Sequence, residues 1–355
     1  MAKVVVVTGA SAGVGRATVR AFALEGAHLG LIARNRERLE RARREVEDVG
    51  GRALVLPADV ADARAVEDAA DRVERELGPV DIWVNNAMAT IFARVVDTRP
   101  EEVRRATEVT YLGTVYGTMA ALRYMYPRNR GVIVQVGSAL AYRSIPLQAA
   151  YCGAKHAIVG FTDSLRSELI ADGKDIHVTV VHLPALNTPQ HSWCRSRLPR
   201  HPQPVPPIYQ PEIAAEAIVW ASKQRLREIQ IGWPTVAAIL GQKVAPGWLD
   251  HHLADYNVQQ TNEPANPNRL DNLFESVPGA WGAHGEFDEE SAAFSAQAWA
   301  SMHRSWLAPI AGGLAGLAFG AAFARKRKQG QSADQATGLR SGARGSERAV
   351  PLKRS

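Results

Sequence analysis

Short apolar runs alternate with amphipathic segments through the first two-thirds of the chain. The runs at residues 3–8 and 27–33 are almost continuously apolar, which is typical of strands buried on both faces of a parallel sheet. The segments between such runs place apolar residues at helical spacing among many charges. This alternation predicts an α/β fold with a doubly wound parallel sheet, whose ligands bind at the carboxyl ends of the strands.

The same pattern predicts the other elements of this region. Further strands are expected at 52–57, 80–84, 131–136, 176–183 and 229–232. Helices are expected from a glycine-rich turn through about residue 25, and at 37–49, 62–77, 101–126, 151–170 and 212–224. The stretch 101–126 is predicted to form one uninterrupted helix.

The alternation stops after Trp233. A helix is predicted at 244–256, irregular structure at 262–288 and a short helix at 289–303. We therefore expect a domain at 1–235 and a mostly irregular and helical C-terminal extension at 236–305. An apolar segment with a basic flank follows at 306–328, and the Gly, Ser, Arg and Gln content of 329–355 predicts disorder.

The composition is that of a globular protein with a basic end. Much of the net charge of +6 comes from residues after 324, so we expect no nucleic-acid partner. The two cysteines, Cys152 and Cys194, are too few for a disulfide framework or a cysteine zinc site. We expect no metal, and we expect a cytoplasmic location because the first residues run directly into a strand without a signal peptide.

One segment near the C-terminus suggests contact with a membrane. Residues 307–324 carry no charge and just reach the roughly 17–25 residues that a bilayer helix needs. Gly312, Gly316 and Gly320 would form a small-residue ridge, and the basic residues 325–328 would bind anionic headgroups. The segment is expected to span the membrane or lie on it; a Gly/Ala helix packed on the protein or on a partner subunit is the alternative.

A glycine-rich turn follows the first strand. Gly9, Gly13 and Gly15 let the backbone approach a ligand, and the helix that follows offers N–H groups and a positive dipole end to a phosphate. The spacing matches neither the G-x-G-x-x-G fingerprint nor a P-loop. Arg34 ends the second strand, where an acidic residue would bind the ribose of NAD and an Arg suits the extra phosphate of NADP. Glycines that only turn the chain and a solvated Arg34 are the alternatives.

Tyr151 and Lys155 stand four residues apart in a predicted helix, and so share one face. An ammonium near a phenol favours the phenolate, which suits a general acid/base for alcohol and carbonyl chemistry. An amphipathic helix with an exposed Lys is the alternative.

A Pro-rich loop between Pro184 and Pro211 is a candidate active-site lid. It carries no carboxylate, and its basic residues would attract an acidic substrate unless the loop is merely solvated. These residues and the loop's tryptophan are Trp193, Arg195, Arg197, Arg200 and His201.

These motifs resemble those of the short-chain dehydrogenase/reductase family over about residues 3–235. They occur in the family's order: the Gly9/Gly13/Gly15 turn, Asp59-Val60, Asn85-Asn86-Ala87, Ser138, and Tyr151 with Lys155. The resemblance implies a Rossmann fold with a seven-stranded sheet, helices on both faces and a nicotinamide cofactor.

The resemblance also implies roles for single residues. Ser138 would hold the substrate oxygen, Tyr151 would act as the acid/base, and Lys155 would bind the nicotinamide ribose and lower the pKa of Tyr151. Asp59 would face the adenine, Asn86 would support the cofactor site, and Thr188 would hold the nicotinamide carboxamide. Further cofactor contacts are implied for Ser11, Val14, Val60, Ala87 and Pro184.

Three positions depart from the family pattern. Met88 and Ala185 stand where the family usually or commonly has Gly. Thr110 stands where many members place a catalytic Asn that anchors a proton-relaying water. Because a Thr hydroxyl can also bind water, we expect a modified relay and keep Thr110 among the catalytic residues.

The sequence therefore predicts an NADP(H)-dependent oxidoreductase that interconverts a small alcohol and its carbonyl compound, with NAD as the alternative cofactor. Hydride would pass between the nicotinamide and the carbonyl carbon while Tyr151 moves the proton. A homo-oligomer is expected. The alternative function is a nucleotide-binding regulatory or scaffold protein without turnover, which Thr110 and Met88 would favour.

Overall fold

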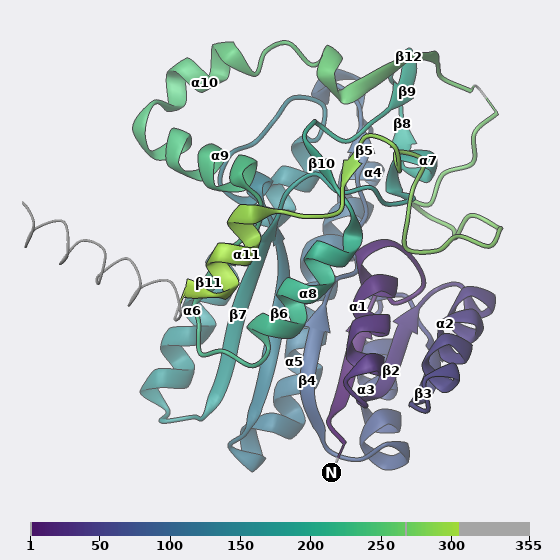
Figure 1. Ribbon diagram of the computed structural model, residues 1–355, viewed down its shortest axis with the longest axis vertical. Helices are drawn as coiled ribbons and strands as arrows, with labels where there is room; N and C mark the ends of the chain where they lie inside the picture. The colour runs from purple at the N-terminus through teal and green to yellow at the C-terminus, as the bar shows by residue number, and fades with distance from the viewer. Residues whose placement is uncertain (1, 267, 305–355) are drawn as a thin grey trace, which may run out of the picture. The chain divides into compact units, whose positions relative to one another are not determined.

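A seven-stranded parallel sheet forms the centre of the protein, in the order β11-β7-β6-β4-β1-β2-β3 (Figure 1). The computed structural model describes residues 2–266 and 268–304. The chain divides into two compact units, Met1–Met302 and His303–Ser355, and the sheet belongs to the first. Its strands are β1 Val4–Thr8, β2 His28–Ala33, β3 Arg52–Pro57, β4 Val80–Asn85, β6 Gly131–Ser138, β7 Ile176–Leu183 and β11 Glu228–Gln230.

The sheet confirms the predicted doubly wound fold. The five residues of β1 are all buried, as expected of a strand covered on both faces. β6 pairs with β7 from Gly131 opposite Ile176 to Ser138 opposite Leu183, so Ser138 lies at the carboxyl end of the sheet. Each predicted strand is present, with bounds that differ by no more than two residues.

Helices cover both faces of the sheet (Figure 1). On one face, Phe22, Leu39 and Ile218 from three helices share one core with the strands. On the other face, Val73, Met125 and Leu165 belong to a second core. The helices are α1 Gly13–Leu24, α2 Arg36–Asp48 and α8 Pro211–Ala221 on the first face, and α3 Ala63–Glu76, α5 Gly113–Arg128 and α6 Ala149–Ala171 on the second.

The predicted uninterrupted helix at 101–126 is wrong in one respect. The segment consists of α4 Pro100–Thr107, a π-helical turn η2 at Glu108–Leu112, and α5. The turn brings Thr110 fully into the interior, and Gly113 packs where a Cβ would stand 2.7 Å from a methyl carbon of Val60. Tertiary packing against the loops after β3 and β4 therefore sets the local winding, which helical periodicity does not reveal.

The C-terminal extension has more structure than predicted. The helix expected at 244–256 is present as the shorter α10 Pro246–His252, and the helix before it, α9 Trp233–Val244, was not predicted. The short helix expected at 289–303 is confined to α11. β12 pairs with β9, and β13 pairs with β10, so the extension returns to the domain. Besides α4, the shorter elements of the described chain are β5 Ile91–Phe92, η1 Val95–Asp97, η3 Ala139–Ala141, α7 Gln190–Trp193, β8 Arg195–Ser196, β9 Arg200–Pro202, β10 Ile208–Tyr209, α9 Trp233–Val244, α10 Pro246–His252, η4 Asn257–Gln259, β12 Gln260–Pro264, β13 Ser291–Ala292 and α11 Ala296–Met302.

No helix within 2–266 and 268–304 combines the length and hydropathy needed to cross a bilayer. The predicted membrane segment at 306–328 and the predicted disorder at 329–355 lie outside the described residues.

Candidate active site

The three glycines of the turn stand where a side chain would strain the backbone or collide with it. Gly9 and Gly13 have φ values of +68° and +55°, which residues with side chains rarely adopt. A Cβ at Gly15 would stand 2.1 Å from the Gly9 carbonyl oxygen, so only glycine lets α1 begin this close to β1. The N–H groups of the first turn of α1 are thus available to a ligand, although that of Gly13 donates to the Gly282 carbonyl at 3.0 Å.

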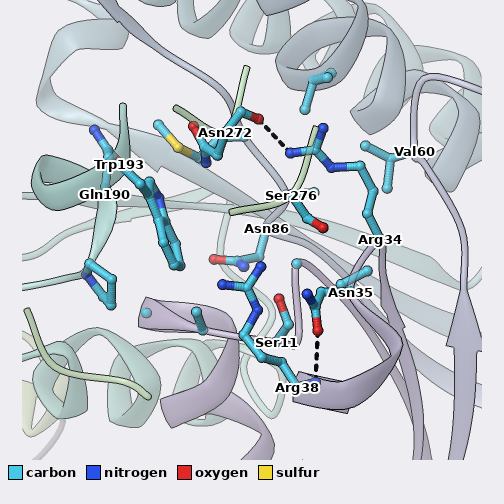
Figure 2. A pocket seen from close by; sticks show the side chains of 18 of the residues that line it. Ser11, Arg34, Asn35, Arg38, Val60, Asn86, Gln190, Trp193, Asn272 and Ser276 are labelled. Carbon is cyan, nitrogen blue, oxygen red and sulfur yellow. Dashed lines mark hydrogen bonds between the residues drawn. The ribbon is translucent and has the colours of Figure 1, made fainter. Parts of the chain in front are cut away.

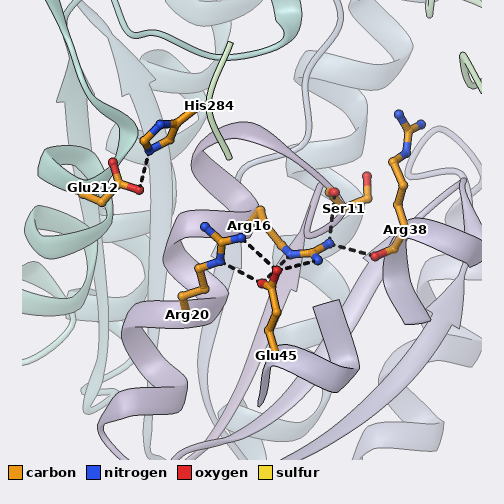
Figure 3. Close-up of polar contacts among 7 residues, drawn as sticks. All are labelled: Ser11, Arg16, Arg20, Arg38, Glu45, Glu212 and His284. Carbon is orange, nitrogen blue, oxygen red and sulfur yellow. Dashed lines mark hydrogen bonds and ion pairs between the residues drawn. The ribbon is translucent and has the colours of Figure 1, made fainter. Parts of the chain in front are cut away.

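A buried arginine ties this turn to the neighbouring helix (Figure 3). Nη1 of Arg16 donates to the carbonyl oxygens of Ser11, at 3.4 Å, and Arg38, at 2.8 Å. Arg16 and Arg20 both bind the Glu45 carboxylate. Burial alone would raise the pKa of Glu45, but the two guanidinium groups lower it to about 2. The cluster therefore fixes the turn against α2, with one carboxylate shared by two guanidinium groups.

A cavity of about 180 Å³ borders the turn and the ends of β2, β3 and β4. We call it the glycine-turn cavity; Figure 2 shows the side chains around it. Gly15 does not line it, and Pro184 lines a second cavity described below. The predicted cofactor residues that line the glycine-turn cavity are Gly9, Ser11, Gly13, Val14, Arg34, Asp59, Val60, Asn86, Ala87 and Thr188.

Arg34 lies in this cavity, but the C-terminal extension holds its guanidinium group. Nη1 donates to the Phe274 carbonyl at 2.8 Å. Nη2 donates to the Asn272 carbonyl at 2.5 Å, as drawn in Figure 2. Burial lowers the pKa of Arg34. Arg34 is therefore not the solvated residue of the alternative reading, and two of its donors already have partners.

Arg38 is the cavity residue that the sequence analysis missed. It is 4% exposed, and its Nε and Nη1 have no hydrogen-bond partner among the described residues. Its guanidinium carbon lies 4.9 Å from the centre of a Trp193 ring. Burial, followed by the charge of Arg34, lowers the pKa of Arg38 to about 10. The one available signal was its position four residues after Arg34, at the start of the predicted helix.

Asn86 and Asp59 have partners that hold the cavity wall in place. The Asn86 side chain donates to the Thr8 carbonyl at 3.0 Å, and its backbone N–H donates to the Thr8 hydroxyl at 2.9 Å. Asp59 accepts the N–H of Ala61 at 3.0 Å and forms an ion pair with Arg105. Asn86 thus fixes the loop after β4 to β1, and Asp59 fixes the loop after β3 to α4.

Ser138, Tyr151 and Lys155 line a second cavity, of about 340 Å³, which we call the Tyr151 cavity. Ser138 ends β6, and the other two lie one turn apart on α6. Lys155 Nζ lies 5.5 Å from the centre of the Tyr151 ring and donates to the Val136 carbonyl at 2.6 Å. The residues lining both cavities, which therefore adjoin, are Val14, Asn86, Met88, Thr188 and Gln190.

The pKa of Tyr151 departs from the sequence expectation. Burial raises it above its ordinary value, and the Ser138 hydroxyl opposes this only in part. Burial also lowers the pKa of Lys155 to about 8, so the ammonium is itself weakened. The expectation of an acidified Tyr151 overlooked desolvation, which dominates when both groups are inside the protein.

Thr110 has backbone partners on both sides of its hydroxyl group. Oγ1 donates to the Ala89 carbonyl and accepts the Ala89 N–H, both at 3.0 Å. Thr110 lines neither cavity, although Met88, next to Ala89, lines both. Its predicted role in a water relay stays a prediction, and its observed contact is with the loop after β4.

Three of the lid's basic residues, Arg195, Arg197 and His201, have carboxylate partners, whereas Arg200 is exposed. Arg195 and Arg197 both pair with the Glu102 carboxylate, at 2.9 and 2.6 Å, and Arg195 also pairs with Asp271. His201 lies 3.2 Å from Glu286. The loop itself carries no carboxylate, and these partners come from α4 and from the extension.

Comparison with known proteins places this geometry in a family. The short chain dehydrogenase family model matches residues 3–197. An uncharacterized oxidoreductase, YxnA, of Bacillus subtilis is 32% identical over 281 residues, covering 78% of this chain and 79% of that protein. An alcohol dehydrogenase from the archaeon Thermococcus sibiricus, solved with 5-hydroxy-NADP, superposes with a TM-score of 0.57 at 28% identity, covering 65% of this chain and 96% of that one. A metagenomic short-chain oxidoreductase, solved with NADP, gives 0.55 at 25% identity, covering 64% and 96%.

The chain belongs to the short-chain dehydrogenase/reductase family. It is an oxidoreductase whose Rossmann fold binds NAD(P).

Proposed function

We propose that the protein is an NADP(H)-dependent oxidoreductase that interconverts an alcohol and a ketone or aldehyde. The observation that carries this proposal is the junction of the two cavities. The glycine-turn cavity, with its helix N-terminus, suits a dinucleotide, and it adjoins the cavity that contains Ser138, Tyr151 and Lys155. A hydride carrier and a proton donor would therefore meet at one carbonyl group.

Arg38 supports NADP over NAD. A buried guanidinium without a hydrogen-bond partner is costly unless an anion compensates it, and Nε and Nη1 of Arg38 are in this state among the described residues. The 2′-phosphate of NADP would supply such an anion. We assign the selectivity to Arg38 ahead of Arg34, because carbonyl groups of the extension already accept from Arg34. The two solved relatives bound to NADP or its derivative point the same way.

The protein's part in the reaction is the handling of one proton. The nicotinamide supplies the hydride chemistry. Ser138 would donate a hydrogen bond to the substrate oxygen, and Tyr151 would give that oxygen its proton during reduction. Because burial raises the pKa of Tyr151, the phenol keeps its proton near neutral pH, which suits donation to a carbonyl. Lys155, one turn away, would hold the cofactor ribose and stabilise the phenolate left behind.

Turnover with a panel of ketones and aldehydes tests the proposal. We expect the purified protein to oxidise NADPH with at least part of the panel, and to bind NADPH roughly tenfold to hundredfold more tightly than NADH, the range of one charged hydrogen bond. Equal affinities for the two cofactors would contradict the NADP assignment. Tight cofactor binding without turnover would favour the regulatory or scaffold alternative.

A further inference from the structure

The wall of the Tyr151 cavity away from the glycine-rich turn is mostly apolar. It combines the loop after β6, the lid and the C-terminal extension, and Figure 1 shows α9 and α10 beyond the carboxyl ends of β6 and β7. The apolar lining residues of these three segments are Leu140, Ile145, Val205, Pro206, Ala238 and Leu253.

This cavity offers little to an ionised substrate. None of its described lining residues is Asp or Glu, and the basic ones are Lys155, Arg143 and His191. Arg143 is neutralised by Asp250 at 2.8 Å and also donates to Gln242 at 2.9 Å. His191 is buried, and burial lowers its pKa to about 3, so its ring is neutral. Lys155 donates to the Val136 carbonyl at 2.6 Å and, in the proposed function, would hold the cofactor ribose. A carboxylate placed in the outer part of the cavity would therefore lose its hydration beside an Arg143 that is already paired with Asp250.

The volume sets the size of the occupant. At roughly 30 Å³ for each water-sized group, a cavity of about 340 Å³ has room for on the order of ten such groups. Part of that room lies beside the residues shared with the glycine-turn cavity, where the reacting end of the cofactor would lie.

We propose that the Tyr151 cavity takes a neutral, largely apolar ketone or aldehyde, and that Ala238 on α9 limits the length of its chain. The proposal rests on the proposed function only for placing the carbonyl group at Ser138 and Tyr151. Chain-length selection is thus made by the extension, whereas the proton is handled by residues of the sheet and α6.

Binding of unreactive analogues tests the substrate class without requiring turnover. Primary alkanamides of increasing length, titrated calorimetrically into the protein saturated with NADP⁺, should gain about fourfold in affinity for each methylene until the cavity is full. Alkanoates of equal length should bind at least about a hundredfold more weakly. An affinity that does not change with the length of the amide, or alkanoates that bind as tightly as amides, would overturn the proposal.

Two neighbouring alanines of α9 provide a matched pair of variants. Ala238 lines the cavity, whereas Ala237 is exposed and lines neither cavity. Ala238→Phe should lower the affinity for the longer amides at least about tenfold and leave the shortest ones unchanged, and Ala237→Phe should match the wild type throughout. Equal behaviour of the two variants would contradict a limiting role for Ala238. If the amides bind as expected but no carbonyl compound is turned over, the proposed function fails and the chemistry of the cavity stands.

Discussion

Arg38 and Arg34 are similar residues, but their different hydrogen-bond partners give them different roles at the cofactor site. Both line the glycine-turn cavity, four residues apart in the chain; Arg38 is buried and Arg34 is half-buried. The extension accepts hydrogen bonds from Arg34, whereas Arg38 has a tryptophan ring as its neighbour and two nitrogen atoms without partners among the described residues. The second residue is therefore the one whose environment improves most when an anion arrives.

Replacing each arginine by glutamine separates the two roles. Arg38→Gln should raise the dissociation constant of NADPH roughly tenfold to hundredfold, since it removes a charged hydrogen bond, and should leave that of NADH within about threefold. Arg34→Gln should weaken both cofactors to a similar degree, because it loosens the extension. Cofactor titration by fluorescence measures both constants, and a selective loss of NADPH binding in Arg34→Gln alone would restore the assignment made from sequence.

Thr110 replaces the family's catalytic Asn with a hydroxyl that both donates to and accepts from one peptide unit. Thr110→Val keeps the shape but leaves the Ala89 N–H and carbonyl buried without that partner, at a cost of about 1–3 kcal/mol. We expect a lower Tm and turnover reduced by roughly one to two decades. Thr110→Ser should recover most of both. A valine variant with wild-type Tm and rate would show that this contact is dispensable.

At the scale of elements, strands with a clear local pattern were predicted from the sequence, whereas features that depend on tertiary contacts were missed. Runs such as 52–57 and 176–183 were predicted with the observed bounds, because β-branched and apolar residues stand there between turn signals. The π-helical turn at η2 was missed because its cause is the packing of Thr110 against another loop. Likewise, Arg38 lies in an Arg- and Glu-rich helix whose pattern is that of a solvated face.

The C-terminal extension completes the cofactor side of the molecule, and no local pattern predicted this. Its carbonyl groups at Asn272, Phe274 and Gly282 accept from Arg34 and Gly13. The Leu273 carbonyl accepts from Arg105 at 3.0 Å, and the same Arg105 pairs with Asp59. An irregular segment far along the chain thus fixes residues of the nucleotide-binding turns.

Leu273 tests this role, since it is fully buried in the core while Leu270, three residues earlier, is 61% exposed. Leu273→Ala should destabilise the protein by about 2–5 kcal/mol, the usual range for a buried leucine, and should weaken NADPH and NADH alike by severalfold. Leu270→Ala should change neither property. Denaturant unfolding and cofactor titration measure the two effects, and an unchanged cofactor affinity in Leu273→Ala would separate the extension from the cofactor site.

At the scale of the whole molecule, the family match ends at residue 197, yet the described residues up to Met302 form one compact unit. Segments beyond the match line both cavities: Asn272 and Ser276 the first, and Pro234, Ala238 and Leu253 the second. The part of the chain beyond the family match therefore contributes to the walls of both cavities.

The apolar and basic segment at 306–328 leads to a prediction about the full chain. Full-length protein should sediment with membranes and resist a salt wash, because its apolar residues would bind the bilayer and residues 325–328 its anionic headgroups. A chain ending at Ser305 should remain in the supernatant with its cofactor affinity intact. Full-length protein found in the supernatant at low salt without detergent would contradict membrane association.

Replacement of the Tyr151 phenol tests the proton-transfer account. In Tyr151→Phe the cavity and the fully buried Lys155 remain while the proton donor is lost, so NADPH-dependent reduction of any accepted carbonyl compound should fall to background. The affinity for NADPH should stay within about threefold of the wild type, because the phenol acts on the substrate. Lys155→Ala, the companion variant, should lose both turnover and part of the cofactor affinity. A Tyr151→Phe protein that retained most of its turnover would contradict the assignment of Tyr151 as the acid/base.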